Sequence, residues 1–343
     1  MTSFALTLGC ALLAFSPTLS LLLLFAYSKA QLVIIVTTSS FFQLLACLLA
    51  ALLHLPFKSL PLGAQGVFII IPTSVIAQAL SRCAFVHCYH KVETVIEKSI
   101  ARHEQQERQS NARNNSTISN NNDGNDNGNE NEGPSESQQL KLELNDVSSG
   151  IAAGVGFAFF HTVMLYGTLL ASENSRQGTL YQESCTMMPS IFNSAIMAFF
   201  FGILDMVWML MTFYGMRRIR DYRLILAQRQ QVNANASTYA NATINNIGIG
   251  NSRNENVNAD ALWSVKSDKI GGNAALALVV VTHFAAAFAT VPNQTMPLNG
   301  CVVALPCLAF VTAVTVGAFW VLFKKNYLPQ GQQQRIRQNR HLD

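Results

Sequence analysis

The sequence predicts an all-α polytopic membrane protein with seven transmembrane helices, the N-terminus outside or lumenal and the C-terminus cytosolic. Half of the 343 residues are apolar (AVILMFWYC) and only 12% are charged, against about 25% in soluble domains. The apolar residues gather in uniform runs close to the roughly 20 residues that a membrane helix needs. Strands of a membrane barrel would instead alternate over segments of about 10 residues. One helical bundle is therefore expected.

Seven apolar runs locate the expected helices. No charged side chain precedes Lys29, so the start of the chain lacks the positive n-region of a cleaved signal peptide and is expected to stay as the first helix. Only Lys29 separates this run from the second, which predicts an antiparallel hairpin. The helices are expected at residues 4–27, 31–53, 67–89, 148–170, 188–216, 274–291 and 300–323.

Polar segments divide the helices into three groups. Asparagine makes up nearly half of segment 111–132 and about a third of segment 233–258, a composition typical of disordered chain. The expected organisation is three helices in residues 1–90, a disordered Asn-rich cytosolic loop in 91–147, two helices in 148–220, a second such loop in 221–270, two helices in 271–325 and a cytosolic tail in 326–343.

Lysine and arginine are distributed unevenly between the two sides of the membrane. With the N-terminus outside, 20 of the 23 lie in cytosolic segments, and only Lys58 and Arg176 lie in outer ones. Cytosolic loops are enriched in these residues, so this orientation is favoured.

The seven cysteines and the sequons predict little chemistry. No two cysteines form a CxxC pair and only Cys185 lies in a connecting loop, so neither a disulfide framework nor a zinc site is expected. Asn293 stands in a sequon in the short outer loop before the last helix. Its glycosylation is left open, because the loop is close to the membrane.

Three ionisable residues lie inside predicted helices, where a charge costs a few kcal/mol and normally has a partner. Counted from the cytosolic ends of their helices, Asp205 and His283 lie at nearly the same depth. We expect them to meet, because a carboxylate and an imidazolium stabilise each other. Arg82 either extends to the inner interface or competes as the partner of Asp205. The alternative is that backbone or water satisfies each group separately.

Two predicted helices carry small residues at every fourth position, a spacing that lets helices approach closely in lipid. The pattern predicts helix contacts without naming the partner. The two sets are Gly150, Gly154 and Ala158, and Ala309, Ala313 and Gly317.

Several features together resemble one family. They are the opening run 9–17, the tight turn between the first two helices, the pair Phe41 and Phe42, the spacing from Gln78 to Arg82, the GxxxGxxxG-like set Gly150, Gly154 and Ala158, the group Trp208, Arg217, Arg218, Arg220 and Tyr222, and the intramembrane His283. In order, spacing and topology they resemble the anterior pharynx-defective family, the seven-helix scaffold subunit of γ-secretase.

The sequence departs from the family pattern at two polar positions. Asp205 stands three residues before Trp208, where the family has a histidine. Ala79 follows Gln78, where the family usually has an acidic residue. Both Asn-rich insertions also lack a counterpart.

The resemblance implies a non-catalytic subunit that assembles presenilin, nicastrin and the presenilin enhancer subunit. The complex would cleave type I membrane proteins, including Notch-type receptors, in endoplasmic reticulum, Golgi, plasma and endosomal membranes. Gly150, Gly154 and Ala158 would pack against partner helices, and Asp205 and His283 would hold a polar point in the bundle. No catalytic residue, cofactor, metal or nucleic acid is expected. Aspartyl chemistry needs two carboxylates, and the predicted helices contain only Asp205.

Other classes of membrane protein fit the sequence less well. A metalloprotease needs several His and Glu ligands, but Ala79 stands where a glutamate is wanted, and His87 and His161 lie alone or near membrane ends. The acidic-Arg-aromatic and Asn-Pro-x2-Tyr motifs of seven-helix receptors are missing. The internal repeats and broken helices of transporters are also missing. A multi-pass transporter or a seven-helix receptor is the alternative function.

Overall fold

The computed structural model describes residues 4–27, 29–57, 67–118, 146–174, 181, 185–243, 259–295 and 300–339. Every secondary-structure element within these ranges is a helix. Seven helices there are long and apolar enough to cross a membrane. The predicted fold class, an all-α protein with seven membrane-spanning helices, is confirmed.

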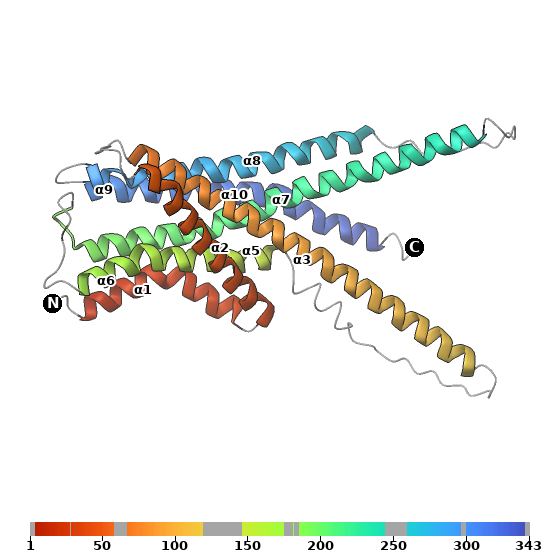
Figure 1. Ribbon diagram of the computed structural model, residues 1–343, viewed down its shortest axis with the longest axis horizontal. Coiled ribbons are helices and arrows are strands. Elements are labelled where there is room, and N and C mark those ends of the chain that lie inside the picture. The colour runs from red at the N-terminus through yellow and green to blue at the C-terminus, as the bar shows by residue number, and fades with distance from the viewer. Residues whose placement is uncertain are drawn as a thin grey trace.

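The seven spans are built from α-helices, two of them continued by π-helical turns. Figure 1 shows the N-terminus, α6 and α9 at one end of the bundle, here called the α9 end, and the C-terminus with the free ends of α3 and α7 at the other, here called the tail end. In chain order the helices are α1 (Phe4–Leu21), η1 (Leu22–Ala26), α2 (Ala30–His54), η2 (Leu55–Phe57), α3 (Val67–Ile118), α5 (Asp146–Thr162), η4 (Val163–Gly167), α6 (Thr168–Asn174), α7 (Ser190–Thr243), α8 (Ala259–Ala289), α9 (Pro292–Thr295) and α10 (Gly300–Asn339).

Three helices continue well past their predicted ends and a fourth begins early. α10 ends at Asn339 rather than at Phe323, and α8 begins at Ala259 rather than at Ala274. α3 ends at Ile118 rather than at Tyr89, and α7 ends at Thr243 rather than at Met216; both extend beyond the bundle in Figure 1. Part of each segment that was expected to be a disordered loop is therefore helical. The residues after Tyr89 are rich in Glu, Lys, Gln, Arg and Ala, which favour helix wherever the chain continues without a breaker. The other Asn-rich residues, 119–145 and 244–258, lie outside the described ranges.

α7 is the central helix of the bundle. In its most apolar window 67% of the residues are buried within the chain, against 17% for the first span and 22% for the last. It packs against α1, α5, α8 and α10. The outer spans therefore leave most of their surface to lipid or to other proteins, while α7 holds the interior.

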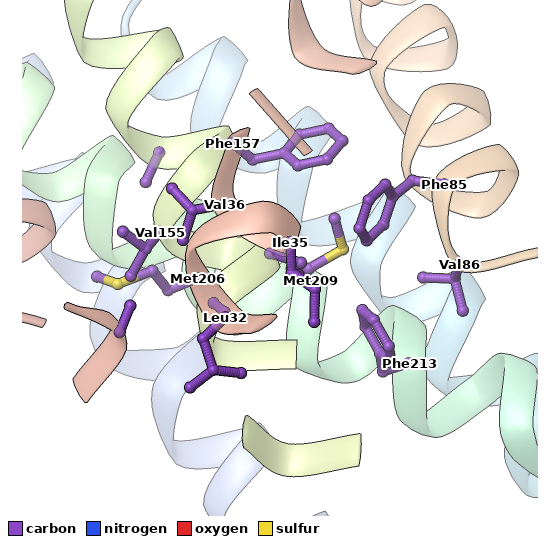
Figure 2. Close-up of a cluster of buried hydrophobic side chains, with 14 residues drawn as sticks. Leu32, Ile35, Val36, Phe85, Val86, Val155, Phe157, Met206, Met209 and Phe213 are labelled. Carbon is purple, nitrogen blue, oxygen red and sulfur yellow. The ribbon is translucent and has the colours of Figure 1, made fainter. Parts of the chain in front are cut away.

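The largest cluster of buried apolar side chains joins α2, α3, α5 and α7 (Figure 2). The ring of Phe85 in α3 lies 6.1 Å from that of Phe157 in α5 and 6.3 Å from that of Phe213 in α7, both edge-on, an arrangement that aromatic pairs prefer. Met209 of α7 belongs to the same cluster. Phe85, Phe157 and Met209 each lie one turn from the polar residues described below, so this packing sets the depth at which those residues meet.

The backbones of α2 and α5 touch at Gly156. A Cβ atom on Gly156 would lie 2.0 Å from the Ser39 hydroxyl and 2.3 Å from the Val36 carbonyl oxygen. The Ser40 hydroxyl donates a hydrogen bond to the Gly156 carbonyl at 3.0 Å. Close approach at a small residue lets a hydroxyl bond across two membrane helices, and this crossing leaves no room for any residue but glycine.

A disulfide joins Cys185, just before α7, to Cys301 at the start of α10. The expectation that the cysteines form no disulfide framework is corrected by this bond. The two cysteines are 116 residues apart, so no local spacing reveals the pair. They come together because the chain returns twice to the α9 end.

Breaking this disulfide is expected to destabilise the protein. Cys185→Ser should lower the free energy of unfolding by about 2–5 kcal/mol, because a native crosslink restricts the unfolded chain. Thermal unfolding in detergent with and without reductant measures the effect: reductant should lower the Tm of the wild type and leave that of Cys185→Ser unchanged. Cys307→Ser is the matched control, because Cys307 is a free, exposed cysteine of the same helix. An equal effect of reductant on all three proteins would contradict the prediction.

Asn293, the sequon residue left open above, is buried in the folded chain. It lies in α9 and is only 6% exposed. Its side-chain amide donates to the sulfur of Met197 in α7, at 3.1 Å. The folded protein therefore does not present this side chain for glycosylation.

Candidate functional site: a buried ion-pair cluster

Arg82 of α3 and Asp205 of α7 form an ion pair in the interior of the bundle. Both side chains are completely buried, and Nη2 of Arg82 donates to Oδ1 of Asp205. Each charge alone would be costly at membrane depth, and pairing with its opposite removes most of that cost. The expectation that Arg82 extends to the inner interface is wrong, whereas the alternative partnership with Asp205 is what the structure has.

Aromatic rings cover the guanidinium of Arg82. Its Cζ atom lies 5.1 Å from the ring centre of Trp208 and 5.7 Å from that of Phe157. Rings at this distance attract a cation through their quadrupole. This attraction and the ion pair with Asp205 together favour the inward position of Arg82.

His161 of α5 holds the second oxygen of the Asp205 carboxylate. Its Nδ1 lies 2.6 Å from Oδ2, and because a carboxylate only accepts, this nitrogen carries the proton. The sequence analysis considered His161 only as a metal ligand and placed it alone or near a membrane end, which is wrong. Its depth was the available signal, because it stands near the middle of the apolar run 148–170, as Asp205 does in the run 188–216.

His283 of α8 contacts Arg82 rather than Asp205. Its Nδ1 lies 3.2 Å from Nη1 of Arg82, and since a guanidinium only donates, this nitrogen accepts. The predicted contact of Asp205 with His283 is thus replaced by one in which Arg82 lies between them. The His283 ring stacks on Trp208 with centroids 4.2 Å apart, and the Trp208 indole donates to Thr282 at 2.9 Å.

The arrangement connects four helices through polar contacts at one depth. It contains one positive and one negative charge with two histidines around them, from α3, α5, α7 and α8. Asp205 is the only carboxylate among the buried residues that the structure describes, and both of its oxygens are occupied. The cluster is therefore a buried ion pair with two histidines that holds four helices together.

The first set of small residues faces another helix of the same chain. A Cβ atom on Gly154 would lie 2.8 Å from the Cα of Met206, and one on Gly150 would lie 3.0 Å from the Leu210 side chain, both in α7. Ala158 is fully buried. The resemblance implied that partner helices pack here; instead α7 occupies this face, because glycine lets the central helix come that close.

The second set of small residues faces out of the bundle. Ala313 and Gly317 are exposed, and a Cβ atom on Gly317 would have no neighbour within 4 Å. Ala309 is partly buried. α10 packs into the bundle through a different face, which consists of Cys301, Ala304, Leu308, Thr312 and Thr315.

Comparison with known proteins identifies the family of this chain. A family model described as Aph-1 protein matches residues 5–250, which include Arg82, His161 and Asp205 and end before α8. No curated protein matches the chain. Because the family match covers well over half of the sequence and includes three members of the polar cluster, the chain belongs to the Aph-1 family, a membership that supports a role as a γ-secretase subunit.

Proposed function

We propose that the protein is the non-catalytic scaffold subunit of γ-secretase, which stabilises presenilin, nicastrin and the presenilin enhancer subunit for intramembrane proteolysis of type I membrane proteins, Notch-type receptors among them. The Aph-1 family match carries this proposal. The single buried carboxylate among the described residues supports a non-catalytic role, because both its oxygens are held by Arg82 and His161 and aspartyl chemistry uses two carboxylates.

The proposed topology places the N-terminus and the α9 end on the outer or lumenal side. The proposed location is the endoplasmic reticulum, Golgi, plasma and endosomal membranes. The Cys185–Cys301 disulfide at the α9 end supports this topology, because disulfides persist in the oxidising compartments. The excess of Lys and Arg at the opposite end supports it as well.

The exposed face of α10 is the proposed contact for a partner helix. Ala313 and Gly317 lie on it between Phe310 and Trp320, which are 69% and 63% exposed. Small residues flanked by large apolar ones form a shallow groove into which another membrane helix can pack. Because the other face of α10 packs against α7 and α8 and its start is held by the disulfide, the helix offers this groove on a fixed support.

Native purification of the tagged full chain in a mild detergent, followed by mass spectrometry, tests the function. Stoichiometric presenilin and nicastrin are expected. A lone stable monomer would refute the scaffold role and favour the transporter or receptor alternative, to be followed by uptake and ligand-binding assays.

Gly317→Leu tests the α10 groove within the same experiment. The variant should fold normally, because nothing lies within 4 Å of the new Cβ, and should retain less of one partner subunit. Gly9→Leu is the matched control, since Gly9 also has no neighbour within 4 Å. Full retention of all partners by Gly317→Leu would refute the groove and leave the scaffold role standing.

A further inference from the structure

One face of α3 stays exposed along the membrane span. Ile76 and Leu80 on this face are 48% and 59% exposed, and Ala84 follows at the same spacing of four residues and is also exposed. Residues three or four positions apart lie on one face of a helix. This face, here called the outer face of α3, is therefore available to lipid or to another protein.

The outer face becomes basic where the apolar run of α3 ends. His87 and Lys91 follow Ala84 at spacings of three and four residues, and Lys98 and Arg102 continue the same face further along the helix. All four side chains are exposed. One continuous face thus changes from apolar to basic on the way out of the membrane.

An ion pair between α3 and α7 shows the level at which the membrane ends. Arg220 of α7 donates to Glu93 of α3 at 2.8 Å. Each stands four residues beyond the end of its own apolar run, which is Met216 in α7 and Tyr89 in α3. The two neighbouring helices therefore leave the apolar layer at the same level, about 6 Å before this ion pair at 1.5 Å per residue.

His87 and Lys91 lie at this level on the outer face. They stand two residues before and two after Tyr89, about 3 Å to either side of it. At a spacing of four residues their Cβ atoms are about 6 Å apart, so both side chains can reach one phosphate group. No acidic residue stands three, four or seven residues from either of them. Basic side chains at this depth contact lipid headgroups.

We propose that the outer face of α3 binds an anionic phospholipid of the leaflet at the tail end. The Lys91 ammonium donates a charge-assisted hydrogen bond to the lipid phosphate, and a ring N–H of His87 donates a second one. An acyl chain lies along the exposed side chains of Ile76 and Leu80. Ala84 is small and leaves room for the glycerol backbone between these two parts.

Lys98 and Arg102 select a lipid with a net negative charge over a zwitterionic one. They stand about 10 Å and 16 Å beyond Lys91 along the helix axis, too far to share its phosphate but close enough to attract a negative headgroup. Side chains of a helix lean toward its N-terminus, which for α3 is toward the membrane. The site is independent of the γ-secretase role, since it needs only this chain and the membrane.

Native mass spectrometry of the purified full chain, titrated with phosphatidylserine and with phosphatidylcholine, tests the site. The wild type should bind the first phosphatidylserine at least about fivefold more tightly than phosphatidylcholine, the effect of roughly one basic side chain at a membrane surface. His87→Gln/Lys91→Gln should lose this preference. Both positions are exposed, so the Tm in detergent should stay that of the wild type.

The matched control for net charge is Lys91→Val/Val92→Lys. It exchanges two neighbouring residues, and Val92 is 56% exposed, so a lysine fits there. The composition and net charge stay the same and the depth changes by only about 1.5 Å, but the ammonium turns by about 100° around the helix, off the outer face. This variant should lose the preference too. A preference kept at the wild-type level would mean attraction by net charge alone and would overturn the proposal.

Two further outcomes would also overturn it. Equal binding of phosphatidylserine and phosphatidylcholine by the wild type would show that the outer face does not select anionic lipid and would leave this face to a protein partner. Equally tight binding of soluble glycerophosphoserine would show that the apolar part of the face has no role and that a free headgroup is the ligand. Copurification of γ-secretase subunits is a separate readout, so failure here leaves the proposed function intact.

Discussion

Asp205→Ala is expected to yield little folded protein. The substitution leaves the Arg82 guanidinium, whose side chain is completely buried, without its counter-charge in the interior of the bundle. Removing one member of a buried ion pair costs about 3–5 kcal/mol, a large part of the roughly 5–15 kcal/mol that separates folded from unfolded states. Size-exclusion chromatography of the detergent-extracted chain, with the Tm of the monodisperse fraction, measures the loss.

Two further variants separate the ion pair from simple loss of packing. Arg82→Met/Asp205→Leu removes both charges and should recover most of the folded fraction, because apolar residues of similar size replace a buried pair without an orphaned charge. His161→Gln should cost less than Asp205→Ala, since Asp205 keeps Arg82 as its partner. Wild-type yield and Tm in Asp205→Ala would show that Arg82 does not depend on this carboxylate.

Gly156→Ala is expected to separate α2 from α5 and to destabilise the fold by about 3 kcal/mol or more, at the upper end of the cost of overpacking. The new Cβ would lie 2.3 Å from the Val36 carbonyl oxygen, which is backbone and cannot rotate away, and the two helices must therefore move apart. That movement also strains the bond from the Ser40 hydroxyl to the Gly156 carbonyl. The Tm in detergent and resistance to limited proteolysis report the change.

Gly9→Ala is the matched control, because a Cβ atom on Gly9 has no neighbour within 4 Å. It should be neutral or slightly stabilising, since alanine favours helix over glycine by up to about 1 kcal/mol. Adding Ser39→Ala to Gly156→Ala should not restore stability, because it removes the Ser39 hydroxyl but leaves the Val36 carbonyl in place. Equal stability of Gly156→Ala and Gly9→Ala would show that the crossing is looser than described.

The seven spans could be predicted because a membrane imposes one simple requirement on each, about 20 apolar residues with few charges. The ends of α3 and α7 could not, since beyond the bilayer that requirement no longer applies and ordinary helix propensity decides. Residues 90–118 are mostly polar, and many of them are types that favour helix. Polarity had been interpreted as disorder there, although it indicates only solvent exposure.

The polar cluster was predicted in part. Counting residues from the helix ends gives the depth of a residue in the membrane. On this basis Asp205 and His283 were predicted to lie at one depth, and both contact Arg82 there. Contact also depends on the direction in which each helix face points, and the sequence does not determine that direction for helices apolar on all sides. For this reason Arg82 lies between the two predicted partners, and the glycine face of α5 turned out to face α7.

The length of α3 has a consequence for the first Asn-rich insertion. From Tyr89 to Ile118 the helix rises about 43 Å at 1.5 Å per residue, so the chain leaves it far from the packed spans. Residues 119–145, which connect it to α5, can span up to about 90 Å at roughly 3.3 Å each. This is roughly twice the distance back. Because the greatest length of 27 residues exceeds that distance, residues can be removed from this insertion, or a reporter domain added to it, without pulling on α3 or α5.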